Sequence, residues 1–235
     1  MLVQMISSFL CLYGLYVLRP FLSLESTQSA GVPDTGGICP LILVHPALQN
    51  RAAWYFYQAA FRKAGFTSIH YFEYSCREHS LSDVAERLAV LVNDVAALSP
   101  DDKPVLIGAS LGGLVARAAL CFPGVAENLS GLITLACPHK GSSLAKLAPK
   151  RVFPLLHGIV YGGPGIEALE AKERTAAGTV PKTAFFSCRD EIVRPVSALY
   201  PPAHQTWREV ETMPISHMTI MLHKQTIDSV INELN

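Results

Sequence analysis

The clearest chemistry in the sequence lies in a short glycine-flanked run around one serine. Residues 108–112 read GASLG, a G-x-S-x-G pattern with Ser110 at its centre. The run follows the apolar segment 105–107 and precedes a helical pattern over 111–120. A sharp turn between a strand and a helix would lift the Ser110 hydroxyl clear of the sheet, at the positive end of the helix. The pattern and its context therefore predict Ser110 as a nucleophile.

A serine hydroxyl is a weak nucleophile near neutral pH, so it needs a base that an acid orients. His217 lies in a loop before the last predicted helix, and Asp190 follows the apolar segment 184–188. Serine, acid and histidine then occur in the order expected after a strand-turn-helix nucleophile. We predict His217 as the general base and Asp190 as the acid, with Glu191 as the nearest rival for the acid.

The other seven histidines are assigned structural roles by default. His139 precedes the acid and is therefore out of order. His223 is expected within the last helix, where its ring would be less free to reach Ser110.

Two backbone N–H groups are expected to bind an oxyanion. One is that of Leu111, at the start of the helix that follows the nucleophile. The other should come from the loop after the first strand, where Pro46 has no N–H to donate. Ala47 is therefore the better candidate there, and Leu48 is the weaker alternative.

Short apolar runs alternate with longer amphipathic ones along the chain. The strands expected from this pattern are 41–44, 68–74, 105–107, 132–136, 183–187 and 206–210. The helices expected are 51–64 with Asn50 as N-cap, one opening at Ser80, 111–120 and 217–234. This alternation predicts an α/β fold with a mostly parallel sheet and helices on both faces.

One stretch, residues 141–181, has no strand pattern. This segment is a long strand-free stretch for the inside of a compact domain, so we expect a short cap or lid. A helical piece is expected over 166–175 within it.

The first 18 residues contain no charged side chain. In a helix such a run would reach about 27 Å, close to the thickness of the hydrocarbon core of a bilayer. Residues 1–19 are therefore predicted to be a signal sequence or a membrane anchor, and a buried N-terminal helix is the alternative. Residues 20–38 are expected to form a linker, and residues 39–235 the domain. We expect the protein to contact a membrane and to be membrane-anchored or exported.

Net charge and cysteine spacing limit the kinds of partner, metal and cofactor that the protein is expected to bind. The chain has 235 residues, 19 basic and 19 acidic side chains, and so no excess positive charge to bind nucleic acid. The six cysteines show no metal-ligand spacing, although Cys39 and Cys76 could pair in an oxidising compartment. No metal or cofactor is predicted.

Four segments resemble the α/β-hydrolase lipases and esterases, in particular the bacterial triacylglycerol lipases. They are 43–46 (LVHP), 107–113 (IGASLGG), 136–142 (ACPHKGS) and 190–195 (DEIVRP). The resemblance implies Ser110 as nucleophile, Asp190 as acid and His217 as base, with Ala47 and Leu111 as oxyanion donors.

The sequence also departs from that family. Its usual His-Gly is His45-Pro46 here, and Cys137 replaces the threonine before Pro-His. The aspartate pair that binds calcium in the larger lipases has no match, which favours a site without metal.

These residues together predict a serine carboxylic ester hydrolase, a lipase or esterase that acts on small-molecule or lipid esters. A transacylase or a lipid deacylase would use the same residues. A hydrolase scaffold that only binds is the alternative from a different class. The natural ester and the oligomeric state stay open.

Overall fold

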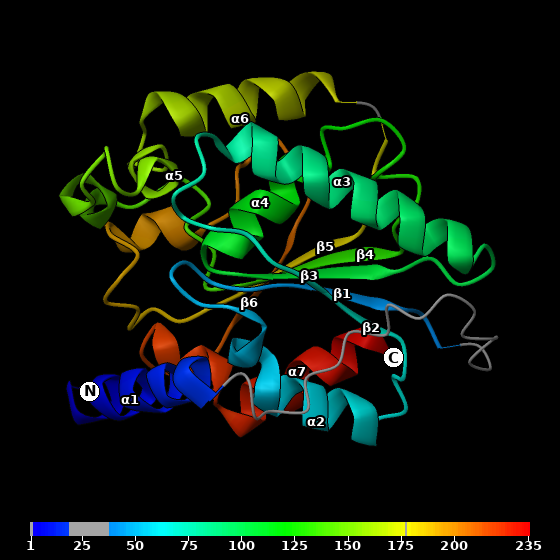
Figure 1. The fold of residues 1–235 in the computed structure, drawn as a ribbon, viewed down its shortest axis with the longest axis horizontal. Helices are drawn as coiled ribbons and strands as arrows, with labels where there is room; N and C mark the ends of the chain where they lie inside the picture. Colours follow the sequence, from blue (N-terminus) through cyan, green and yellow to red (C-terminus); the bar gives the residue numbers. More distant parts are fainter. Residues whose placement is uncertain (1, 19–37, 177) are drawn as a thin grey trace.

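Six parallel strands form a single sheet in the order β2-β1-β3-β4-β5-β6 (Figure 1). The computed structural model describes residues 2–18, 38–176 and 178–235, so the expected linker lies outside the described residues except for residue 38. The strands are β1 (Leu41–Val44), β2 (Ile69–Phe72), β3 (Val105–Ala109), β4 (Gly131–Leu135), β5 (Lys182–Phe186) and β6 (Arg208–Glu211). The predicted parallel sheet is confirmed.

The inner strands are short apolar runs because helices cover both of their faces. Every residue of the inner strands β1 and β3 is buried, and so is every residue of the edge strand β2. The other edge strand, β6, is mostly exposed. The β6 sequence, REVE, is accordingly charged.

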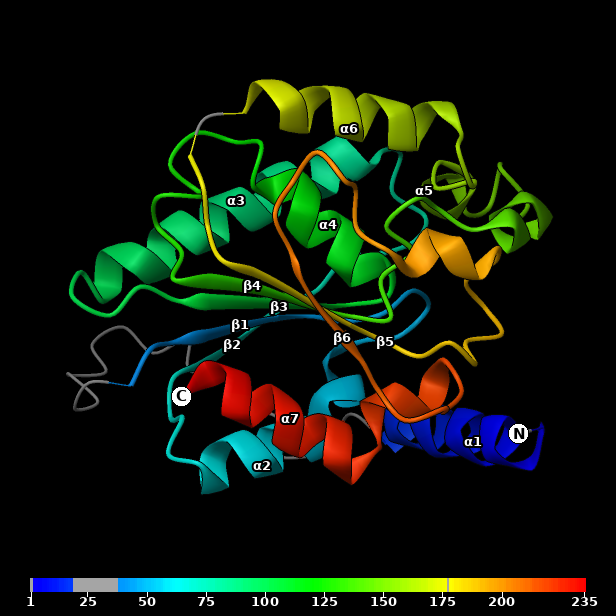
Figure 2. The same cartoon turned by 180° about the vertical axis from the view of Figure 1, so that it is seen from behind.

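Two layers of helices enclose the sheet (Figures 1 and 2). On one side lie α3 (Leu81–Leu98), α4 (Leu111–Ala119) and α6 (Pro164–Thr175). On the other lie α1 (Leu2–Leu18), α2 (Tyr55–Lys63) and α7 (Lys224–Leu234). A separate apolar cluster fills the space between the sheet and each layer.

The predicted helix starts agree with the capping contacts. The Ser80 side chain accepts a hydrogen bond from the N–H of Asp83, and α3 begins at the next residue. The Asn50 side chain accepts one from the N–H of Ala52, but the first turn there is the 3-10 helix η2 (Arg51–Trp54) before α2 begins.

The segment 141–181 contains three short helical elements and no strand of the sheet. They are η3 (Ser143–Leu147), α5 (Pro154–His157) and α6. We call residues 141–181 the cap. A further 3-10 turn, η4 (Val196–Leu199), follows β5.

The prediction of one continuous helix over residues 217–234 is wrong. The chain forms the 3-10 turn η5 (Met218–Met221), and α7 then begins at Lys224. His223 is therefore the residue before α7 and not within a helix. The break coincides with a change of neighbour, since η5 packs against α1 whereas α7 packs against α2.

The suggested pairing of Cys39 with Cys76 is also wrong, since both thiols are free. Cys39 precedes the start of β1, and Cys76 follows the end of β2. These two strands are parallel neighbours, so the two cysteines lie at opposite edges of the sheet.

No helix within residues 2–18, 38–176 and 178–235 combines the length and hydropathy needed to cross a bilayer.

Candidate active site

Ser110 occupies a strained turn between β3 and α4. Its backbone lies at φ 50° and ψ −121°, in a region that side chains rarely adopt. The Ser110 N–H donates to the carbonyl of Leu135 at 2.7 Å, which fixes the turn to the neighbouring strand.

The glycines on either side make this turn sterically feasible. A Cβ on Gly108 would lie 2.5 Å from the carbonyl oxygen of Gly112, and one on Gly112 would lie 2.4 Å from that of Val44. No real Cβ tolerates such contacts, so the G-x-S-x-G pattern follows from the close approach of α4 to β1 and β3.

The structure brings Ser110, His217 and Asp190 into one hydrogen-bonded chain. Ser110 Oγ lies 3.0 Å from His217 Nε2, and His217 Nδ1 lies 2.6 Å from Asp190 Oδ2. The ring can therefore accept the serine proton on one nitrogen while it donates to the carboxylate from the other.

Asp190 is fully buried, and hydrogen bonds surround its carboxylate. Its second oxygen, Oδ1, accepts from the N–H groups of Ile192 at 2.9 Å and Val193 at 2.7 Å. These donors stabilise the ionised carboxylate and fix its orientation towards His217.

The pKa of His217 is raised above its usual value. Burial alone would lower it, but the charge of Asp190 and its hydrogen bond, together with the charge of Glu191, outweigh burial. A raised pKa stabilises the imidazolium that forms when the ring takes a proton.

Three further hydrogen bonds position the loop that carries His217. Ser187 Oγ donates to the carbonyl of Ile215 at 2.7 Å and accepts from its N–H at 3.0 Å. Glu191 Oε2 accepts from the N–H of His217 at 3.1 Å. Glu191, the rival for the acid, thus contacts the backbone of His217 and not its ring.

Leu111 directly follows Ser110, and Ala47 directly follows Pro46, which lines the small cavity at Ser110. Leu111 begins α4, where the first N–H groups of a helix have no partner within it. Leu48 has φ 57° and directs its N–H to Cys76 Sγ at 3.3 Å, so that group is already engaged. Ala47 stays the predicted donor from this loop.

Contacts between His45 and Tyr74 hold the loop that carries Ala47. The ring of His45 stacks on Tyr74 at 4.5 Å between centroids, and the Tyr74 hydroxyl donates to the carbonyl of His45 at 3.0 Å. These contacts hold the His45-Pro46 segment that differs from the usual His-Gly.

The space next to Ser110 is very small. A cavity of about 10 Å³ touches Ser110 and His217, which is barely the volume of one water. Its remaining walls include Pro46, Met218 and Met221. A larger cleft of about 770 Å³ is lined by the loop that carries Ala47, by residues 73–78 and by Phe153 of the cap.

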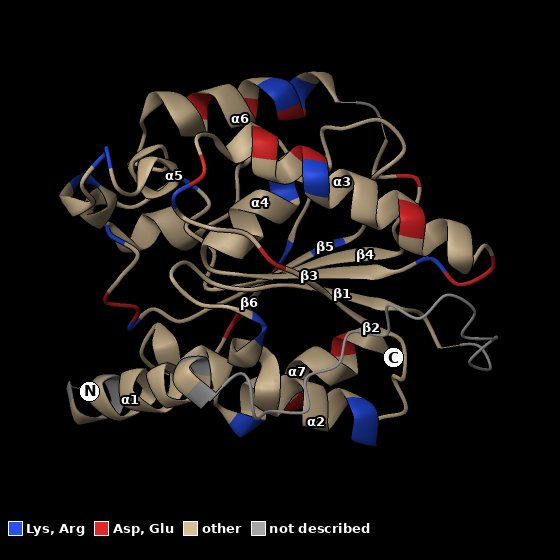
Figure 3. Ribbon diagram, viewed as in Figure 1, with Lys and Arg blue, Asp and Glu red and all other residues tan. Residues whose placement is uncertain are grey.

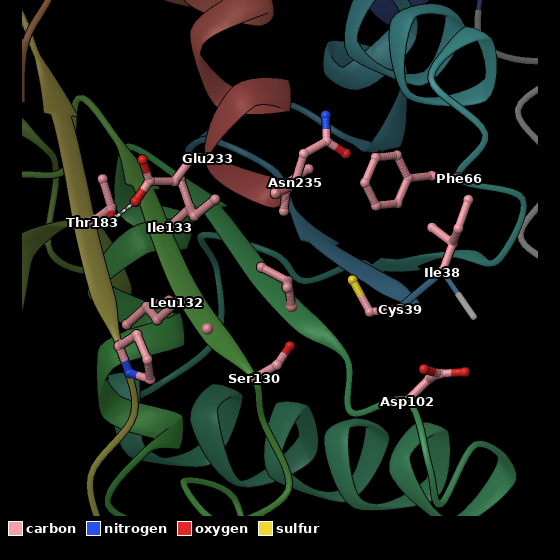
Figure 4. A pocket seen from close by; sticks show the side chains of 14 residues that line it. Ile38, Cys39, Phe66, Asp102, Ser130, Leu132, Ile133, Thr183, Glu233 and Asn235 are labelled. Atoms are coloured by element: carbon pink, nitrogen blue, oxygen red, sulfur yellow. Dashed lines mark hydrogen bonds between the residues drawn. The ribbon is translucent and has the colours of Figure 1, made fainter.

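Another pocket lies at the opposite edge of the sheet (Figure 4). It has a volume of about 460 Å³ and adjoins Val105 and Thr183, at the starts of β3 and β5. Thr183 donates to Glu233 there at 2.7 Å. Because Ser110 follows the end of β3, this pocket is separate from the triad.

A second buried polar cluster joins the cap to the sheet. Arg117 on α4 makes a two-pronged ion pair with Glu173 on α6, at 2.9 and 2.7 Å, and donates to the carbonyl of His139 at 2.6 Å. Arg117 is fully buried. His139 is thus a structural residue in this cluster, as its place in the sequence indicated.

The sequence did not reveal the partners that complete these two clusters. Glu191, Ser187, Arg117 and Glu173 are separated from their partners by 26 to 56 residues, and no local pattern signals such contacts. Among the described residues, no group of His, Cys, Asp and Glu side chains has the arrangement of a metal site.

Comparisons with known proteins agree with this geometry. Residues 41–233 match the family model described as the alpha/beta hydrolase family. No curated protein matches the sequence closely enough to count as a relative.

Solved structures resemble the fold at low sequence identity. Aspergillus fumigatus lipase B superposes with a TM-score of 0.72 at 18% identity, over 87% of this chain and 54% of that one. This chain therefore spans about half the length of that lipase. For the mature Bacillus licheniformis lipase BlEst2 the TM-score is 0.68 at 16% identity, over 88% and 96% of the two chains. For phospholipase PlaB of Legionella pneumophila the TM-score is 0.66 at 16% identity, over 85% of this chain and 60% of that one.

The family match covers most of the chain, and the sheet, the turn at Ser110 and the similar structures agree with it. The chain belongs to the alpha/beta hydrolase family.

Proposed function

We propose that this chain is a serine carboxylic ester hydrolase, a lipase or an esterase, that acts through a covalent acyl-enzyme. The observation that carries the proposal is the unbroken hydrogen-bonded chain from Ser110 through His217 to Asp190. The ring of the proposed base contacts both the proposed nucleophile and the proposed acid, which supports these assignments.

The first half of the proposed reaction makes the acyl-enzyme. His217 Nε2 takes the proton of the Ser110 hydroxyl while Oγ bonds to the ester carbonyl carbon. The carbonyl oxygen becomes an oxyanion, which the N–H groups of Leu111 and Ala47 stabilise by about 3 kcal/mol each. The imidazolium then protonates the leaving alcohol oxygen, the carbon–oxygen bond breaks, and the acyl group stays on Ser110.

The second half returns the free enzyme. Water attacks the acyl carbon, and His217 takes its proton. The tetrahedral intermediate then expels Ser110 Oγ, which regains its proton from the ring. Asp190 remains ionised throughout and holds the ring in the tautomer that accepts at Nε2.

The substrate is proposed to be an ester of a small molecule or a lipid. Lipases and a phospholipase are among the similar structures, which supports a lipid ester. We also propose that residues 1–19 direct export or contact a membrane, because residues 1–18 carry no charge.

A chain-length series of nitrophenyl esters tests the proposal. We expect the wild type to hydrolyse at least one ester and Ser110→Ala to lose several orders of magnitude in kcat/KM. A steep preference for long chains above their solubility limit would favour a lipase, and a preference for short soluble esters would favour an esterase. Equal rates in the wild type and Ser110→Ala would contradict the proposed mechanism.

A further inference from the structure

An exposed apolar stripe follows α1 along its whole length. Val3, Ile6, Leu10, Tyr13 and Val17 recur every three or four residues and therefore share one face of the helix. Their exposed fractions lie between 47% and 81%. The helix has no charged residue, and a continuous apolar face of this kind marks an interaction surface.

The opposite face of α1 is fixed to the wall of the catalytic pocket. Leu12 is fully buried in the apolar cluster beneath the sheet. Ser8 Oγ lies 2.8 Å from Thr219 Oγ1 of η5. The neighbours of Thr219 in η5, Met218 and Ile220, line the small cavity at Ser110. The exposed stripe and the nucleophile are thus held by one connected element.

The cap presents a second surface, which is basic as well as apolar. Lys146, Lys150 and Arg151 are exposed, and no ion pair within the described residues involves them. No acidic residue occurs between residues 140 and 166. Leu144, Leu147 and Val152 in the same segment are exposed apolar side chains. Leu147 has the largest exposed fraction of the three, 78%. The term basic cap surface is used here for residues 144–152.

Both surfaces lie at the end of the molecule where the strands terminate and Ser110 is placed. Figures 1 and 2, which view the fold from opposite sides, both show α1 and α5 at this end, on opposite sides of the sheet. Figure 3 shows α1 without Lys, Arg, Asp or Glu and shows basic segments in the loops that flank α5.

We propose that the α1 stripe and the basic cap surface together seat this end of the molecule on an anionic lipid bilayer. Apolar side chains enter the interface while lysine and arginine bind the lipid headgroups, and each contribution strengthens the other. If two copies of the chain met through these surfaces, their basic residues would face each other. The repulsion between these like charges disfavours a dimer. The functional meaning rests on the proposed ester hydrolysis: the enzyme reaches esters that are held in the bilayer.

Vesicle binding by full-length Ser110→Ala protein tests this surface without dependence on catalysis. The probes are vesicles of phosphatidylcholine alone and vesicles that also contain phosphatidylglycerol, followed by sedimentation. We expect binding to the anionic vesicles that weakens as salt is raised, because salt screens the headgroup charge. Combined substitution of Lys146, Lys150 and Arg151 by Gln should weaken that binding on the order of 100-fold.

Matched substitutions at the opposite end of the molecule serve as controls. Arg62, Lys63 and Lys103 are also exposed cations, and their replacement by Gln should leave binding unchanged. Leu147→Ser should weaken binding, whereas Leu98→Ser, which changes a residue of similar exposure at the end of α3, should not.

Three results would overturn the proposal. One is equal binding to neutral and anionic vesicles. Another is equal loss of binding in the cap variants and the control variants. The third is absence of vesicle binding together with a dimer, detected by sedimentation equilibrium, that Leu10→Ser in α1 dissociates. If vesicle binding holds but soluble esters are not hydrolysed, the proposed function fails and the docking surface stands.

Discussion

Two buried histidines show how neighbouring charges decide what a residue can do. The side chains of His217 and His139 are both almost fully buried, and burial by itself lowers the pKa of each. Around His217 the carboxylates of Asp190 and Glu191 reverse this effect and raise the pKa. Around His139 burial is reinforced by the charges of Arg117 and Lys140, so its pKa falls well below the usual value.

The difference in partners matches the difference in role. His217 lies between a carboxylate and the Ser110 hydroxyl, so it can cycle between its neutral and charged forms. The ring of His139 contacts Thr134 at 3.2 Å and the edge of Trp207 at 4.9 Å between centroids, and it stays neutral. We infer that the His217 region performs chemistry, while the His139 region holds the cap.

Replacement of each histidine by alanine should give the largest contrast. His217→Ala should lower kcat/KM for a soluble nitrophenyl ester by roughly 10⁴- to 10⁶-fold, because the serine loses its base. His139→Ala should retain most activity but unfold at lower urea concentration. Comparable activity losses in the two folded variants would remove the distinction between the regions.

Asp190→Asn should have the next largest effect, a loss of about 10⁴-fold in kcat/KM. The amide is nearly the same size as the carboxylate, but it neither stabilises the imidazolium nor enforces the reactive tautomer. Esterase assays together with circular dichroism provide the check. Glu191→Gln is the matched control, and a larger loss in that variant would identify Glu191 as the acid.

Arg117→Ala should destabilise the fold by about 3–5 kcal/mol, because it leaves the buried Glu173 carboxylate with only the more distant His204 ring, at 3.8 Å. Urea unfolding measures this free energy. The double variant Arg117→Met, Glu173→Leu removes both charges and should recover most of the loss. An Arg117→Ala protein as stable as the wild type would show that the ion pair does not hold the cap.

Glu191→Gln should have the smallest effect, a change in pH dependence only. The neutral form of His217 is the active base, so kcat/KM should fall as pH drops through the pKa of this ring. The negative charge of Glu191 helps to raise that pKa, so its removal lowers the pKa and extends activity to lower pH. A pH–rate profile that moved to higher pH would contradict the proposed electrostatics.

Local chemistry explains which features could be predicted from the sequence. The turn at Ser110 depends on glycines at 108 and 112, which are required by contacts within a few residues and with the adjacent strand. The buried strands and the N-cap of α3 at Ser80 also depend on short stretches of sequence, and the structure confirms them. Asp190 and His217 were predicted from chain order, and they lie in contact with each other.

Features that depend on distant packing could not be predicted. The break at His223 reflects the packing of η5 on α1, which no pattern within 217–234 reveals. The partnership of Arg117 with Glu173 spans 56 residues. The suggested pairing of Cys39 with Cys76 failed because only the strand directions show that these residues lie at opposite edges of the sheet.

The most direct test of the account is covalent labelling of the folded protein with a fluorophosphonate, followed by peptide mass spectrometry. The account predicts a single phosphonyl adduct on the oxygen of residue 110, formed rapidly in the wild type and far more slowly in His217→Ala. A folded wild-type protein that resists the reagent, or that carries the adduct on another residue, would contradict the claim that Ser110 is the activated nucleophile.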